Sequence, residues 1–114
     1  MEYALLVHEM PGAYDGLSDE ERQAVLGEYW TLRDDPRVVA GAALHPVETV
    51  TTVRVHDGDT LVTDGPFADT KEVFAGWYVI EADDIDAAIE IASRCPAARF
   101  GGSVEVRPVL EPRL

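Results

Sequence analysis

Apolar residues alternate along several short stretches of the chain in the pattern of β-strands. Residues 3–8 and 73–81 are apolar on both alternating faces, which is typical of strands buried on two sides. The Asp57-Gly58 dipeptide between two β-branched stretches indicates a tight hairpin turn. The predicted strands are residues 3–8, 38–45, 51–56, 60–63, 73–81 and 103–109.

A first helix is predicted from Ser18 to Asp34. Ser18 and Glu21 have the spacing of a capping box, which satisfies free backbone N–H groups at a helix start. Pro36 ends the helix because proline disfavours helical geometry in the residue before it. The apolar stripe that recurs at helical spacing consists of Val25, Tyr29 and Leu32, and Leu26 and Trp30 widen it.

A second helix is predicted over residues 84–94, with Asp83 as its N-cap. Pro96 ends it. The residues expected to form its apolar face are Ile85, Ala88, Ile89 and Ala92, which follow the i, i+3, i+4, i+7 spacing.

The order of elements predicts the fold. A β-α-β unit is followed by a β-hairpin and then by a second β-α-β unit, and two helices suffice to cover only one face of an antiparallel sheet. We therefore expect an α+β fold, a ferredoxin-like two-layer sandwich with an inserted β-hairpin, in one domain over residues 1–114.

The apolar character of both strand faces predicts a second copy of the chain. Two helices leave one sheet face uncovered, and wet apolar surface costs about 25 cal/mol per Å². A large exposed apolar patch usually marks a partner surface. We expect a homodimer whose sheets stack face to face, with a cleft between the subunits. The alternative is that the hairpin or the C-terminal tail folds back over the face.

Charge and composition exclude several classes of protein. The chain has 114 residues, with 9 Lys plus Arg against 22 Asp plus Glu and a net charge of −13. Such an acidic chain is not expected to bind nucleic acid or an anionic membrane surface. A single cysteine, Cys95, cannot form an internal disulfide and favours a reducing, cytoplasmic location.

Motifs for cofactors and metals are lacking. The sequence contains no GxGxxG, P-loop or GxSxG motif, which favours cofactor-independent chemistry. The histidines, His8, His45 and His56, are scattered and have no metal-ligand spacing. His8 and His45 lie at predicted strand ends, where functional side chains concentrate. Both are candidate catalytic residues, whereas His56 beside the hairpin turn is expected to be solvated.

The segment from Asp64 to Glu72 contains the most unusual combination of side chains. Two close aspartates, Asp64 and Asp69, can shift each other's pKa and act as acid and base. The candidate ligand-binding residues are Lys71, the chain's only lysine, with Arg54, Phe67 and Glu72. A rigid turn is the competing interpretation: Gly65 adopts unusual dihedral angles, Phe67 anchors the loop, and Asp64 caps backbone amides. We also expect Arg54 to pair with Asp64 across the hairpin.

The same segment carries a family resemblance. Asp64-Gly65-Pro66-Phe67, followed by residues 68–72, resembles the signature of the DGPF branch of the YCII-related family. Residues 51–55, 61–63, 95–98 and 104–109 extend the resemblance over nearly the whole chain. It implies a dimeric ferredoxin-like α+β barrel. The broader group includes a dehydrochlorinase-like enzyme and is associated with a His–Asp acid–base pair in a cleft.

The resemblance leaves the function open. The predicted first helix contains no histidine, so a His–Asp pair carried by that helix is absent here. One hypothesis is cofactor-independent binding or acid–base chemistry on a small molecule in the dimer cleft. The alternative is a non-catalytic module for a regulatory protein partner, because genes of the DGPF branch often lie near alternative sigma factors, and the acidic chain would be steered to a basic surface. A metal-binding role ranks last.

Overall fold

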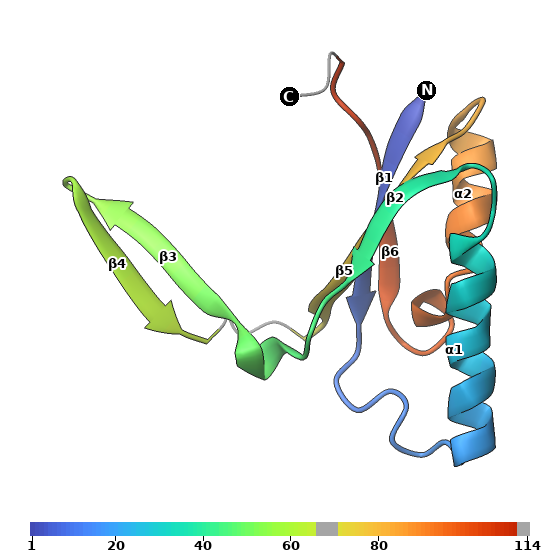
Figure 1. Cartoon of the computed structure of the whole chain (residues 1–114), viewed down its shortest axis with the longest axis horizontal. Coiled ribbons are helices and arrows are strands. Elements are labelled where there is room, and N and C mark those ends of the chain that lie inside the picture. The colour runs from blue at the N-terminus through green and yellow to red at the C-terminus, as the bar shows by residue number, and fades with distance from the viewer. Residues whose placement is uncertain (66–70, 112–114) are drawn as a thin grey trace.

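The computed structural model describes residues 1–65 and 71–111 and forms two layers, a sheet and a pair of helices (Figure 1). The main sheet is antiparallel, with strand order β2-β5-β1-β6. The predicted ferredoxin-like sandwich with an inserted hairpin is confirmed. The elements are β1 (Glu2–Glu9), α1 (Asp19–Arg33), β2 (Val38–Ala43), β3 (Thr51–His56), β4 (Asp59–Asp64), β5 (Val73–Glu81), α2 (Ile85–Ser93) and β6 (Ser103–Pro108), with the 3-10 turns η1 (Val47–Thr49) and η2 (Pro96–Ala98).

The core lies between the sheet and the two helices. Tyr3, Leu5 and Val7 of β1 point to the helices and are buried, while Ala4 and Leu6 point to the other face and are only partly covered. The largest fully buried side chains are Leu5, Leu32, Ile80, Ile91, Cys95 and Pro96. The alternation of β1 thus positions one apolar face against the helices and leaves the other without a cover from them.

Local signals fix the start of each helix. The predicted capping box is confirmed, since the Glu21 backbone N–H donates to Ser18 Oγ and the Ser18 N–H donates to Glu21 Oε1. In α2 the N-cap is Asp84 rather than the predicted Asp83, because the Ala87 N–H donates to Asp84 Oδ1 at 2.8 Å. The cap therefore lies one residue later than the sequence suggested.

The predicted apolar face of α2 is partly wrong. Ala88 and Ala92 are buried as expected, but Ile85 and Ile89 are exposed and Ile91 occupies the core. Two overlapping stripes share helical spacing on this short helix. The small alanines face the sheet together with Ile91, which allows the helix to pack closely and turns Ile85 and Ile89 outward.

The hairpin of β3 and β4 projects away from the main sheet (Figure 1). Its turn at Asp57 and Gly58 has positive φ at both residues, 49° and 82°, as the Asp-Gly signal predicts. Every hairpin residue except Thr52 is exposed. The hairpin therefore does not fold back over the open sheet face, and Leu110 in the C-terminal tail is also exposed.

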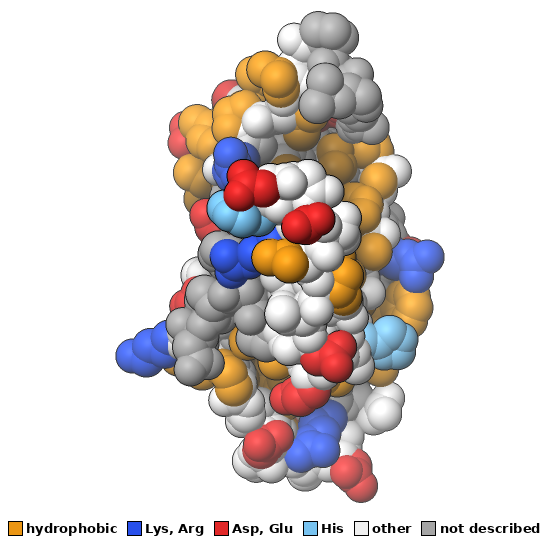
Figure 2. All heavy atoms as spheres, turned by 90° about the vertical axis from the view of Figure 1, so that its left-hand side faces the viewer, with side chains coloured by type: hydrophobic (Ala, Val, Ile, Leu, Met, Phe, Trp, Pro, Cys, Tyr) orange, Lys and Arg blue, Asp and Glu red, His pale blue; other side chains and the backbone are white. Residues whose placement is uncertain are grey.

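The uncovered sheet surface, here called the open face, has an apolar centre and a polar edge on β6. Val79 lies opposite Ala4 and Trp77 opposite Leu6, so all four share this face. Its members are Ala4, Leu6, His8, Phe74, Trp77, Val79, Glu105 and Arg107. Figure 2 views the molecule from the side of the hairpin and shows hydrophobic side chains among the charged ones. This surface has the composition expected of a partner contact.

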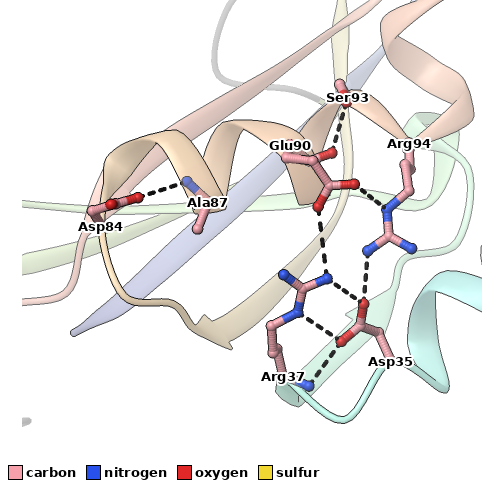
Figure 3. Close-up of polar contacts among 7 residues, drawn as sticks. All are labelled: Asp35, Arg37, Asp84, Ala87, Glu90, Ser93 and Arg94. Atoms are coloured by element: carbon pink, nitrogen blue, oxygen red, sulfur yellow. Dashed lines mark hydrogen bonds and ion pairs between the residues drawn. The ribbon is translucent and has the colours of Figure 1, made fainter.

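An ion-pair network joins the ends of both helices to β2 (Figure 3). The Asp35 carboxylate, whose side chain is only 9% exposed, accepts hydrogen bonds from the backbone N–H and guanidinium of Arg37 and from Arg94 Nη2 at 2.7 Å. Glu90 completes it by pairing with both arginines. The hydrogen bonds from Arg37, followed by that from Arg94, lower the pKa of Asp35 well below its usual range.

Asp35→Asn is expected to lower the free energy of unfolding by about 1–2 kcal/mol, because it removes charge-assisted hydrogen bonds from a nearly buried group. Since folding lowers the pKa of Asp35, its contribution is present above the ordinary aspartate value of about 4 and is lost as the pH falls below it. Denaturant unfolding between neutral and acid pH measures both effects. The exposed neighbour gives the control, Asp34→Asn; equal losses in the two variants would contradict the role of Asp35.

Candidate active site

A pocket of about 620 Å³ lies between α1 and the β2 edge of the sheet. The sheet is wider than the helix that covers it here, so β2 forms one rim and α1 the other. The pocket is lined by Val7, Glu9, Leu26, Tyr29, Trp30, Arg33, residues 38–44 and residues 75–78. Its volume falls within the range of about 300–1,000 Å³ that small-molecule sites occupy.

Two glycines line the sheet side of this hollow. Gly41 lies opposite Tyr78 and Gly76 lies opposite Ala43 and Val7, which places both glycines on the helix side of the sheet. A Cβ on Gly41 would lie 2.8 Å from the Trp77 carbonyl oxygen and 2.9 Å from the Tyr78 ring. A Cβ on Gly76 would lie 2.8 Å from the Ala42 carbonyl oxygen. Neighbouring backbone and the Tyr78 ring occupy the space that a Cβ would need, so both positions require glycine. Gly41, Gly76 and Tyr78 together line the sheet side of the pocket.

The wall formed by α1 is aromatic and carries one positive charge. Trp30 is 51% exposed although it belongs to the apolar stripe of the helix, and Leu26 one turn earlier is also exposed. The guanidinium of Arg33 lies 5.0 Å from the Trp30 ring centroid, within the range of a cation–π contact. The exposed Trp30 indole offers a stacking surface for a planar ligand.

A carboxylate and two phenols form a hydrogen-bonded cluster, and two of its members, Glu9 and Tyr29, line the pocket. Tyr14 Oη lies 3.1 Å and Tyr29 Oη 3.0 Å from the same oxygen of Glu9, Oε1, and both phenols donate to it. The two phenol oxygens are 3.3 Å apart. Glu9 comes from the end of β1, Tyr14 from the following loop and Tyr29 from the middle of α1, so only the folded chain brings the three together.

Burial controls the ionisation of the two phenols. It raises the pKa of Tyr14 to about 12, and the nearby Glu9 charge acts in the same direction. Burial, followed by the hydrogen bond with Tyr14, raises the pKa of Tyr29 well above its usual range. Both phenols therefore remain protonated at neutral pH and serve as hydrogen-bond donors to Glu9.

His8 is the only histidine among the predicted catalytic residues that has a carboxylate partner in the described part of the chain. Its Nε2 lies 2.5 Å from Glu105 Oε1, and its ring packs against Phe74 with centroids 5.5 Å apart. The group lies on the open face, on the opposite side of the sheet from Glu9. His45 follows β2 and is exposed, and no ion pair within 4.0 Å joins it to a described residue.

The structure disperses the other predicted residues. Asp64 is exposed at the end of β4, and neither His8 nor His45 forms an ion pair with it. The expected neighbours Arg54 and Asp64 do not face each other across the hairpin, because Arg54 lies opposite Leu61 and Asp64 opposite Thr51.

The loop that carries the signature is only partly described. Lys71 is exposed, and Glu72 accepts a hydrogen bond from Ser103 Oγ at 2.7 Å. Gly65 has φ of 107°, which agrees with its predicted role in a turn. Asp69 and Phe67 lie outside the described residues. Within the described ranges, no group of three or more His, Cys, Asp or Glu side chains is arranged to hold a metal ion.

The pocket residues Glu9, Tyr29 and Arg33 were not predicted from the sequence to form a site. Two signals point to them in retrospect. Glu9 is an acidic residue at the end of an apolar strand, where functional groups concentrate. On α1, the exposed Leu26 and Trp30 continue an apolar stripe beyond the width that the sheet covers.

The fold and the pocket define the class of this protein: a small ferredoxin-like sandwich with a concave site between its first helix and the sheet edge. Residues 1–113 match the family model described as the YCII-related domain, and the chain belongs to this family. The predicted family is thus confirmed, while its DGPF branch stays a prediction.

Two similar proteins are informative in different ways. An uncharacterized protein of Rhizobium meliloti (strain 1021), R00369, is 35% identical over 115 residues, covering 96% of this chain and 92% of that protein. A solved structure of 5-chloro-2-hydroxyhydroquinone dehydrochlorinase (TftG) from Burkholderia phenoliruptrix AC1100, in complex with 2,5-dihydroxybenzoquinone, aligns over 100% of both chains with a TM-score of 0.50. At 15% identity, this likeness shows the shared fold.

Alkaline titration tests the buried phenol pair. Ultraviolet absorbance of tyrosinate is expected to show late-titrating groups, and Tyr29→Phe removes one of them. Because folding raises these pKa values, their contribution to the free energy of unfolding is present below the ordinary tyrosine value of about 10 and is lost as the pH rises through about 12 for Tyr14. Ionisation of all four tyrosines near pH 10 in the folded protein would contradict the buried cluster.

Proposed function

We propose that this chain binds a small, planar organic molecule in the pocket between α1 and β2, and that Glu9 can accept a proton from it. The observation that carries this proposal is a mostly apolar hollow into which the Glu9 carboxylate and the Tyr29 phenol project as polar groups. Ligand sites typically join apolar walls to a few placed polar groups. Proton transfer to Glu9 needs no cofactor in this scheme, because the carboxylate is itself the acceptor and the phenols of Tyr14 and Tyr29 hold it in place by hydrogen bonds.

The shape of the pocket favours a flat ligand over a bulky one. Gly41, Gly76 and Tyr78 line its sheet side, and Trp30 offers an exposed ring on the helix side. An aromatic ring placed between these surfaces gains apolar burial and stacking, together worth about 1–3 kcal/mol. The dehydrochlorinase with the same fold supports this class of ligand, because its solved complex contains a planar dihydroxybenzoquinone.

The open face supports a homodimer as the working form. The isolated hairpin of β3 and β4 has no sheet beneath it, and two-stranded hairpins are at best marginally stable in water. The hairpin projects from the side of the sheet opposite the helices, which is the side of the open face (Figure 1). Its exposed apolar residues are Val53, Val55, Leu61 and Val62. A second copy would cover both and would enclose His8 and Glu105, which keeps His8 a candidate acid–base residue of a dimer cleft.

The binding proposal predicts a ligand-dependent rise in thermal stability. Planar aromatic compounds, with 2,5-dihydroxybenzoquinone among those tested, are expected to raise the melting temperature. A ligand at a hundredfold excess over its Kd adds about 2.7 kcal/mol to the free energy of unfolding. Ala43→Leu should abolish the effect, because Ala43 faces the pocket opposite Gly76.

Ala98→Leu is the control for Ala43→Leu, since Ala98 is exposed on η2 and lies outside the pocket. It should respond to the ligands as the unchanged protein does. A panel in which no compound shifts the melting temperature would contradict the proposed function. The same conclusion follows if Ala43→Leu binds as tightly as Ala98→Leu.

The dimer proposal predicts that a charge on the hairpin separates the subunits. Val62 faces Val53 across the hairpin, and both are about 60% exposed, so Val62→Lys leaves the main sheet intact. Sedimentation velocity should show a dimer for the unchanged protein and for the control Ile89→Lys, whose residue is exposed on α2. It should show a monomer for Val62→Lys. A monomeric unchanged protein at micromolar concentration would exclude the dimer.

A further inference from the structure

The geometry points to a specific class of ligand for this pocket: an aromatic ring that carries a hydroxyl group at one end and a negative charge at the other. This inference rests on the proposed function and narrows it. The hydroxyl would donate to Glu9 Oε2, and the anionic group would pair with Arg33. Both protein groups line the same hollow, and Glu9 is hydrogen-bonded to Tyr29, which lies one helical turn before Arg33 on α1.

Both hydrogen bonds to Glu9 from the phenols are accepted by Oε1, which leaves Oε2 for a ligand. Tyr14 and Tyr29 each carry a single phenol proton, and both phenols lie at donor distance from Oε1, 3.1 and 3.0 Å away. Oε2 accepts no hydrogen bond from the described residues. A carboxylate accepts at both oxygens. A ligand group that donates a proton therefore fits at Oε2, whereas an ether, a carbonyl or a second carboxylate faces an acceptor and is disfavoured.

Arg33 supplies the complementary end. It lies four residues after Tyr29 on α1, which corresponds to a rise of about 6 Å along the helix and to the length of a para-substituted benzene ring. Within the described ranges, no carboxylate lies within 4.0 Å of its guanidinium, whose contact is the Trp30 ring. In a chain of net charge −13, this unpaired cation beside an aromatic wall selects an anionic ring substituent.

The positions of the two charges also fix the ligand's orientation. A carboxylate placed at the Glu9 end would meet a like charge, and a hydroxyl placed at the Arg33 end would leave the anionic group without its partner. Only one arrangement satisfies both ends. Gly41, Gly76 and Tyr78, on the sheet side of the pocket, then lie beneath the ring.

Isothermal titration calorimetry on the full chain tests this specificity with three probes: para-hydroxybenzoate, para-methoxybenzoate and para-cresol. The methoxy compound keeps the charge but lacks the donor, and the cresol keeps the donor but lacks the charge. We expect para-hydroxybenzoate to bind about tenfold or more tightly than either, since each change removes a hydrogen bond to a charged group. This comparison uses the unchanged protein and does not depend on how any variant folds.

Variants assign each preference to its residue. Glu9→Gln should reduce the difference in affinity between para-hydroxybenzoate and para-methoxybenzoate. Arg33→Met should abolish the difference in affinity between para-hydroxybenzoate and para-cresol. Arg99→Met is the control for the second variant, because Arg99 is exposed after η2 and lies outside both the pocket and the open face, and it should keep all three affinities.

Two results would overturn the inference, and they differ in what they leave standing. Equal binding of the hydroxy and methoxy compounds, or of para-hydroxybenzoate and para-cresol, would refute the specificity while the pocket remains a site for planar molecules. Failure of all three probes, together with failure of the wider aromatic panel, would refute the specificity and the proposed function together.

Discussion

The width of the helical layer relative to the sheet determines the rest of this structure. Two helices pack against the sheet, and α1 leaves part of the edge strand β2 uncovered. Gly41 and Gly76 line the sheet side of the remaining space, where neighbouring atoms leave no room for a Cβ at either position. The result is a hollow instead of a continuous core, with Trp30 and Leu26 exposed above it.

The other side of the sheet is also left uncovered by the helices. The open face contains Leu6, Trp77 and Val79, and neither helix reaches it. The neighbouring residues His8 and Glu9 end β1 with their side chains on opposite faces, so one strand end supplies a polar group to each side. The alternation of side chains along β1 thereby places Glu9 in the pocket and the His8–Glu105 pair on the open face, which we propose is covered by a second copy of the chain.

Much of the fold could be predicted because its signals are local. The Ser18 capping box, the Asp57-Gly58 turn and the two-sided apolar strand at 73–81 each depend on residues close in sequence, and each is confirmed. The face of α2 could not be predicted, since Ile85 and Ile91 fit helical stripes equally well and only packing against the sheet selects between them.

The site was harder to predict for a related reason. Glu9 and Tyr29 are twenty residues apart, and nothing in the sequence announces that the end of β1 lies beside the middle of α1. The segment from Asp64 to Glu72 was predicted as a candidate site because its carboxylates, hydroxyl and lysine are close together in the sequence. Its described carboxylate at Asp64, however, is exposed at the base of the hairpin, away from the pocket lining. Chemistry that depends on tertiary spacing is visible only once the strands are paired.

If a ligand binds in the hollow between α1 and β2, its contacts should be visible residue by residue in NMR spectra of the backbone amide and indole N–H groups recorded during titration with para-hydroxybenzoate. The largest shifts are expected at Gly41, Gly76 and the Trp30 indole. Shifts confined to the hairpin, to the segment after Asp64 or to the open face would contradict binding in this hollow.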